Sequence, residues 1–164
     1  MARSDNDRVV QPSLLDRLTD EFPRESSDRG TTFEASAAAF RASVKHDLNA
    51  LLNTRRTIVQ ATVDQPEVRN SVHQFGLPDT SGRYSFANLQ GRQQLAQDIL
   101  DAIQRFEPRL TSVKVMLTDQ SGGHMPQLRF SISATLLMDP SPEQIVFDTV
   151  LEVASGMYQV GEGN

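Results

Sequence analysis

The hydrophobic pattern of the chain changes its period once, near residue 110, and this change limits the fold more than any other feature. Before it, apolar residues recur every three or four positions, as on one face of a helix. After it, they alternate with polar residues, as on a half-buried strand. Helices followed by strands are typical of an α+β fold. We therefore expect N-terminal helices packed on a small, mainly antiparallel C-terminal sheet of about three strands.

Two of the four expected helices lie near the N-terminus. A short one covers residues 12–18, where Ser13 can cap it and three leucines form a docking stripe that is too short to be stable alone. A long one begins at a capping box in which Thr31 is the cap and Glu34 reaches back to it, and it ends near residues 53–56. The apolar stripe of the long helix consists of Ala37, Phe40, Val44, Leu48 and Leu51.

Two further helices precede the change of period. Pro66 suits the first position of a third, short helix, and Gly76 suits the left-handed position just past its end. Val68, Val72 and Phe75 would form the apolar face of this helix. A fourth helix runs from about Phe86 to Phe106, and Pro108 ends it, because residues before a proline are disfavoured in the helical conformation.

The three expected strands cover residues 111–118, 128–136 and 145–153, and the first two are joined through Ser121–Gly123. The remaining ends of the chain carry little apolar surface to bury. We therefore expect a single domain at 12–155, flanked by mobile tails at 1–11 and 156–164.

Composition excludes several classes of protein. The chain has 164 residues, a net charge of -5 and no cysteine, which suits one domain and excludes disulfide scaffolds and thiolate metal sites. An acidic balance argues against a general nucleic-acid binder. The N-terminus lacks the apolar core of a secretory signal, and no apolar run approaches the roughly 20 residues of a membrane helix. We expect a soluble cytoplasmic protein.

No residue pattern marks a metal or cofactor site. His46, His73 and His124 lack the spacing of a zinc site, and Gly122–Gly123 lacks the Lys-Ser/Thr of a phosphate loop. Glycoside hydrolysis needs two carboxyl groups in different environments across a cleft, but the sequence offers candidates by residue type only and few aromatic platforms for a sugar. These candidates are Glu107, Glu143, Asp148 and Glu152. We expect no catalytic residue, no cofactor and no metal.

The segment Glu107–Pro108–Arg109 carries the most information about function. Glu107 stands at the C-terminal end of a helix, where a negative charge is disfavoured by about 0.3–1 kcal/mol. Pro108 fixes its own backbone and restricts Glu107, so the two charged side chains leave the backbone in preset directions. Such a corner can present an ion-pairing site to a partner. The alternative is a plain helix end where Glu107 and Arg109 pair with each other.

Five segments, taken in order, resemble the TssE family, which comprises baseplate subunits of the type VI secretion system. These segments are Leu14–Leu18, Ser43–Arg56, Phe75–Asp79, Phe106–Leu110 and Val146–Leu151. The TssE family is grouped with the baseplate wedge proteins of contractile phages, once labelled lysozyme-like, and the Glu-Pro-Arg triplet is its hallmark.

The resemblance implies a structural role at the cytoplasmic side of the bacterial inner membrane. Its implied partners are TssF, TssG and TssK in the baseplate and TssB and TssC in the contractile sheath, with no nucleic acid and no direct membrane insertion. It assigns partner binding to Glu107, Pro108 and Arg109, and it implies that the sheet pairs with sheath strands. A short sheet with no helix after it offers such an edge at 145–153 or at 111–118.

Two alternatives to a structural subunit stay open. A peptidoglycan hydrolase, as the old lysozyme-like label suggests, is the weaker one because nothing marks a pair of catalytic carboxyl groups. A generic adaptor or nucleic-acid-associated protein is the other, and its binding to nucleic acid would weaken steeply with salt.

Overall fold

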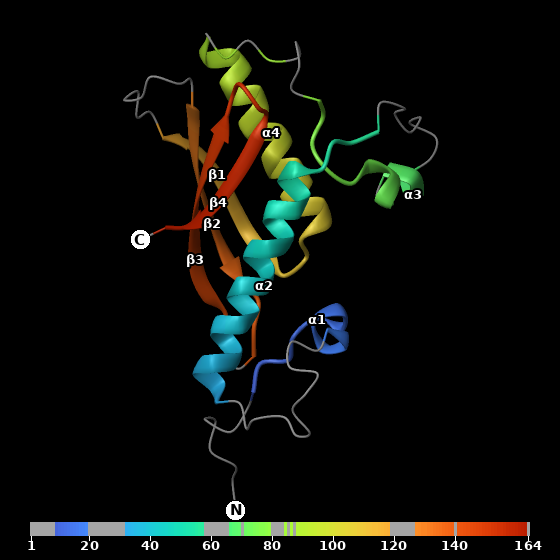
Figure 1. The fold of residues 1–164 in the computed structure, drawn as a ribbon, viewed down its shortest axis with the longest axis vertical. Coiled ribbons are helices and arrows are strands. Elements are labelled where there is room, and N and C mark those ends of the chain that lie inside the picture. The colour runs from blue at the N-terminus through green and yellow to red at the C-terminus, as the bar shows by residue number, and fades with distance from the viewer. Residues whose placement is uncertain are drawn as a thin grey trace, which may run out of the picture.

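Two long helices, α2 (Phe33–Asn53) and α4 (Leu89–Phe106), lie on one face of an antiparallel sheet in the computed structural model of the chain (Figure 1). The structure describes residues 9–19, 32–57, 66–69, 71–79, 84, 86, 88–118, 127–139 and 141–163. α4 packs mainly against the first strand and α2 against the last, and the two helices contact each other. This two-layer arrangement confirms the α+β fold class.

Four strands form the sheet in sequence order, and each pairs antiparallel with the next. They are β1 (Leu110–Thr118), β2 (Gln127–Leu136), β3 (Glu143–Glu152) and β4 (Met157–Glu162). Every second residue of β2 and β3 faces the helices, as the alternating pattern predicts. The connection expected at Ser121–Gly123 lies outside the described residues.

The fourth strand corrects the expectation that residues 156–164 form a mobile tail. Met157–Glu162 pairs with β3, and Tyr158 is buried. The sequence conceals this strand because only Tyr158 and Val160 point into the core, and Gly161 is a poor strand former. Pairing with β3, rather than local propensity, makes this segment a strand.

The position of β4 decides which strands have an open edge. β3 pairs on both sides, so the expectation of a free edge at 145–153 is wrong. The alternative at 111–118 is an edge, because β1 pairs only with β2 among the described residues, and β4 is the opposite edge. Within β1, Ser112 adopts a φ of 51° at a β-bulge, which allows both Leu110 and Val113 to face the core.

The long helix has the buried face that the sequence predicts, but its first residue differs. All five residues of the apolar stripe are buried. The N-cap is Thr32, whose side chain accepts a hydrogen bond from the N–H of Ala35, whereas Thr31 lies outside the described residues. Because Ala35 then occupies the third helical position, the reciprocal bond expected from Glu34 cannot form there. The helix ends at Asn53, as expected.

Capping side chains also set the start of the first and the last helix. α1 (Leu14–Leu18) is capped by Ser13, as the sequence predicts. α4 is capped by Asn88, whose side chain accepts a hydrogen bond from the N–H of Gly91. This helix therefore begins three residues later than the expected Phe86.

The helix expected over residues 66–76 is divided in two. α3 (Pro66–Arg69) is followed by a short 3₁₀ turn, η2 (Val72–Gln74). Ser71 caps this new turn with its side chain, which offers the backbone an alternative to continuing the helix. Val72, expected on an apolar face, is consequently 89% exposed.

The N-terminal segment is anchored where the sequence predicts a tail of residues 1–11. Residues 1–8 lie outside the described part of the chain. Val10 is buried, and its N–H donates a hydrogen bond of 3.0 Å to Oγ of Ser36 on α2. The tail therefore cannot extend to residue 11, and the division of the chain into one domain stays a prediction.

Gly76 allows the segment after η2 to return to the end of α2. It has a φ of +99°, as expected, and a β-carbon at this position would lie 2.3 Å from the carbonyl oxygen of Thr54. The N–H of Leu77 donates to this same oxygen at 2.9 Å, and the carbonyl of Leu77 accepts from the N–H of Arg56 at 2.7 Å. This close approach holds Leu77 in the core.

Replacing Gly76 with alanine should lower the free energy of unfolding by about 2 kcal/mol or more, because the left-handed backbone and the contact with Thr54 both oppose a β-carbon. The melting temperature should fall by roughly 4–8 °C. The control is Gly91→Ala, which improves helix propensity in α4 and should leave stability unchanged or raise it by up to about 1 kcal/mol. Equal effects of the two substitutions in urea unfolding would contradict this account.

Candidate functional site

Residues 107–110 form a tight corner between α4 and β1. The N–H of Glu107 completes the last turn of α4 by donating to the carbonyl of Ile103 at 2.9 Å, and its own carbonyl accepts from Leu110 at 3.1 Å. Pro108 lies exposed at the tip of this turn, where its fixed φ suits the bend. Arg109 is tied to the end of β2, because its carbonyl accepts a 2.8 Å bond from Leu137.

The carboxylate of Glu107 is buried and bound by Arg109. Glu107 is only 4% exposed. Its Oε1 accepts from Nε of Arg109 at 2.6 Å, and its Oε2 accepts from Nη2 at 2.5 Å, so the two planar groups face each other as a fork. Glu107 and Arg109 therefore do pair with each other, as one of the two hypotheses from the sequence held, and the carboxylate of this pair is buried while the Arg109 side chain is 21% exposed. The guanidinium offsets both the burial of the carboxylate and its unfavourable place at a helix C-terminus.

The same guanidinium also reaches across to α2. Its Nη2 donates to Oδ2 of Asp47 at 2.5 Å, Nη1 lies 3.4 Å from Oγ of Ser43, and the group lies 5.8 Å from the ring centre of Phe40. These three residues are spaced by three and four, so they share one face of the helix. The hydrogen bond with Glu107, followed by that with Asp47, raises the pKa of Arg109 above its ordinary value despite partial burial. Arg109 is therefore charged at every working pH.

Ser43 extends the network to the N-terminal helix α1. Its hydroxyl accepts from Arg109 and donates to Oδ2 of Asp16 at 2.7 Å. Hydrogen bonds from Ser13 and then Ser43 hold the pKa of Asp16 below its usual value of 3.8. The corner, α2 and α1 are thus joined by one continuous chain of polar contacts.

Sequence reasoning found the corner but missed the residues that hold it. Asp47 and Ser43 belong to a segment noted for its resemblance, yet nothing in their spacing names Arg109 as their partner. The signal in the sequence that could have found them was their position. Both residues border the apolar stripe of α2, and their spacing of four places them on the same side of that helix. Asp16 likewise gave a signal only as a capping residue.

The carboxylates considered for glycoside hydrolysis lie in separate places. Glu107 is bound by Arg109, and Glu143 forms an ion pair of 2.8 Å with Arg41 of α2. Asp148 is exposed on β3, and Glu152 accepts a hydrogen bond from Ser155. These four residues do not form the facing acid and base that hydrolysis requires.

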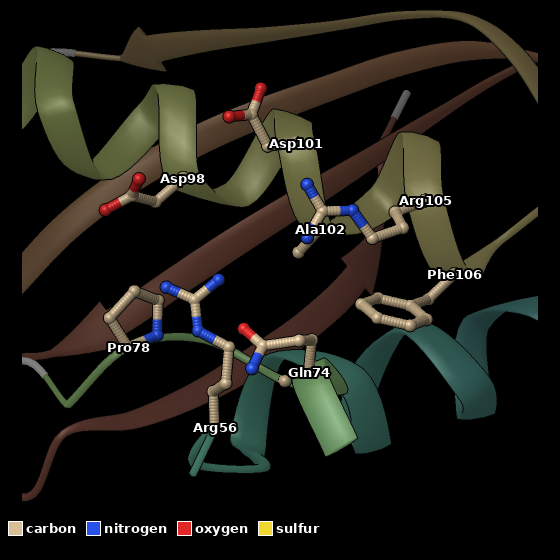
Figure 2. A pocket seen from close by; sticks show the side chains of 9 residues that line it. Arg56, Gln74, Pro78, Asp98, Asp101, Ala102, Arg105 and Phe106 are labelled. Atoms are coloured by element: carbon tan, nitrogen blue, oxygen red, sulfur yellow. The ribbon is translucent and has the colours of Figure 1, made fainter. Parts of the chain in front are cut away.

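A small polar cavity lies between α4, the end of α2 and the segment around Gly76 (Figure 2). Charged groups of both signs line it, and Figure 2 shows the side chain of Arg56 extending toward α4, which carries Asp98, Asp101 and Arg105. Its volume is about 40 Å³, whereas ligand pockets usually measure roughly 300–1,000 Å³. This cavity can hold water but not a sugar chain.

The described residues give no further chemical site of the kinds considered. Among them, no group of three or more His, Cys, Asp or Glu side chains is placed to hold a metal ion. His46 and His73 are exposed, and His124 lies outside the described residues. Within the same part of the chain, none of the helices combines the length and apolar character needed to cross a membrane.

A comparison with protein families shows to which family the chain belongs. The family described as baseplate wedge protein gp25 matches residues 38–141, more than half of the chain. The chain belongs to this family. The match confirms the resemblance seen in the sequence, and it includes the whole corner together with Ser43 and Asp47. No curated protein matches the chain.

Membership in the gp25 family gives the chain a structural role. A baseplate wedge protein is a component of a phage-tail-like assembly and contacts other components of that baseplate. The gp25 match begins at residue 38 and ends at residue 141, so the N-terminal helix α1 precedes it, and β3 and β4 follow it.

Removing the guanidinium should destabilise the isolated protein. Arg109→Ala leaves the carboxylate of Glu107 buried without its partner, and we expect a loss of roughly 2–4 kcal/mol in the free energy of unfolding. Adding Glu107→Gln to Arg109→Ala should recover part of this loss, because a neutral amide is easier to bury. The control is Arg41→Ala at the half-exposed pair with Glu143, which should cost about 0–1 kcal/mol. Similar losses for both arginines in urea unfolding would show that burial of Glu107 does not matter.

Proposed function

We propose that this gp25-family chain is the wedge subunit of a type VI secretion baseplate, where it helps to assemble the wedge and to seat the contractile sheath. The observation that carries the proposal is the Glu-Pro-Arg corner, a solvent-reaching turn fixed by a buried ion pair and by contacts with α2. The ordered TssE-like segments in the sequence support the type VI assignment over other contractile systems. The proposed site of action is the cytoplasmic side of the inner membrane, beside TssF, TssG and TssK.

The groups that the corner offers to a partner are Pro108, Arg109 and Asp47. Pro108 is exposed, and the side chains of Arg109 and Asp47 are 21% and 45% exposed. Of the five N–H donors of Arg109, one on Nη1 has no acceptor among the described residues, and Oδ1 of Asp47 accepts no hydrogen bond there. Glu107 is too buried for direct contact, so its role in partner binding is to orient Arg109.

Seating of the sheath would use an open edge of the sheet. An edge strand has unpaired backbone N–H and C=O groups, onto which a strand of TssB or TssC can add. β1 and β4 are the two edges among the described residues. The support for this part of the proposal is the topology of the sheet together with the resemblance to the TssE family.

Binding to purified TssF–TssG tests the corner. Arg109→Lys keeps the positive charge but loses the planar fork, so we expect affinity to fall about 10- to 100-fold through the loss of one or two charge-assisted hydrogen bonds. Asp47→Asn replaces the half-exposed carboxylate beside Arg109 with a neutral amide and leaves the guanidinium in place. It should therefore weaken binding less. Arg41→Lys is the matched control and should leave binding unchanged. Unaltered affinity of a folded Arg109→Lys protein would refute the proposed site.

Proline scanning tests the sheet edge. Substitutions in β1 or β4 at residues whose N–H points away from the sheet should leave the protein folded and stop it from seeding sheaths in reconstitution. Val150→Pro is the control for misfolding, because Val150 pairs with Arg129 on one side and Gln159 on the other. Normal sheath assembly by every folded β1 and β4 variant would exclude pairing at these edges.

A further inference from the structure

The N-terminal helix α1 exposes nearly all of its apolar surface. Leu14, Leu15 and Leu18, which we call the leucine ridge, are 70%, 73% and 74% exposed, and α1 buries none of its residues. Figure 1 shows α1 beside α2, on the side away from the sheet. The ridge is therefore not part of the core, although leucine is among the residues most often buried.

Polar anchors hold the ridge in place. Ser13 and Asp16 form a capping box, with bonds of 2.7 Å between the side chains and 3.2 Å to the backbone. Asp16 is bound in turn by Ser43 of α2 at 2.7 Å, and the N–H of Val10 is bound to Ser36, about two turns earlier on the same helix. A five-residue helix is not stable alone in water, so its order depends on these contacts. The anchors fix α1 while leaving its leucines facing solvent.

The anchor of α1 is also a contact of the corner. The hydroxyl of Ser43 lies between Asp16 and Arg109, so α1, which carries the ridge, and the corner adjoin on one side of α2. We propose that the leucine ridge inserts into an apolar groove on the same baseplate subunit that receives the Glu107–Arg109 corner. This inference rests on the proposed function and adds to it the apolar half of the interface.

The surroundings of the ridge favour a protein groove over a lipid surface. α1 is only about 7.5 Å long at 1.5 Å per residue, and membrane-bound amphipathic helices carry a lysine- and arginine-rich polar face. Here Asp16 and Arg17 cancel, and the chain has a net charge of -5. Anionic lipid would therefore gain little electrostatic attraction.

The size of the ridge favours a shared interface over a homodimer. Stable interfaces bury a total of about 1,200–2,000 Å², more than three leucines on one short helix can supply from each side. Next to the corner, however, the ridge completes the usual arrangement of an apolar anchor with a polar rim. Because α1 lies outside residues 38–141 matched by the gp25 family, the ridge adds a contact beyond the shared wedge core and can make the choice of partner more specific.

Replacing the three leucines with glutamine tests the ridge, because glutamine keeps helix propensity but removes the apolar surface. The triple variant should keep its melting temperature and bind purified TssF–TssG about 100-fold more weakly. The matched control carries Leu89→Gln and Val72→Gln, two exposed apolar residues outside α1, and should bind within about threefold of the parent. Equal affinity of the triple variant and the parent would overturn the inference.

A second variant tests the anchor. Ser43→Ala keeps the leucines but releases α1 from its place beside Arg109, so binding should weaken, and adding it to the triple variant should weaken binding little further. If the losses in binding free energy from Ser43→Ala and from the triple variant were fully additive, the inference that the ridge and its anchor belong to one binding surface would be overturned.

The hypothesis that the corner binds a partner and the hypothesis that the ridge does so can be refuted separately. Loss of binding by Arg109→Lys alone would preserve the proposed function and refute the ridge, whereas full binding by both variants would refute both. Sedimentation of the isolated protein tests whether the ridge binds a second copy of the chain. Flotation with anionic vesicles tests whether it binds a lipid surface. Leucine-dependent self-association or vesicle binding, with unchanged affinity for TssF–TssG, would replace the protein groove with a second copy or a lipid surface.

Discussion

The contact between the Arg109 guanidinium and the buried Glu107 carboxylate is the constraint on which the candidate site depends. A carboxylate at the end of a helix is disfavoured by the helix dipole, and burial adds a desolvation cost. A planar cation with two parallel hydrogen bonds offsets both, and a lysine could not make that fork. Since the guanidinium also binds Asp47, this one group fixes the end of α4, the start of β1 and the middle of α2 relative to one another.

The long helix α2 serves the core and the site at the same time. Its apolar stripe faces the sheet and α4, while Ser43 and Asp47 at the border of the stripe hold the corner. The corner is therefore held by the same helix that supplies part of the core. A surface that is already ordered loses little conformational entropy when it binds, which suits a structural component of a baseplate.

The sheet presents a different kind of surface, made of backbone hydrogen-bonding groups, at its two edge strands. β2 and β3 are satisfied on both sides by neighbouring strands, and the open hydrogen-bonding groups are left to β1 and β4 among the described residues. β1 begins directly after the corner, so a force on that edge would act next to the site proposed for the wedge partner. The fold thus places two candidate contacts on a single strand, a polar one at its start and one of backbone type along its edge.

The sequence by itself determined the features that depend on neighbours along the chain. The stripe of α2, the cap at Ser13, the left-handed Gly76 and the helix end before Pro108 all follow from spacing and local backbone preference. The tertiary structure alone decided features that depend on distant partners. β4 has too few inward residues to be visible and exists because β3 pairs with it. The burial of Glu107, and the bond of its partner Arg109 to Asp47, which lies 62 positions before Arg109, arise only when α4 packs beside α2. Local preferences act within a few residues, whereas pairing of charges and strands is set by which surfaces the folded chain brings together.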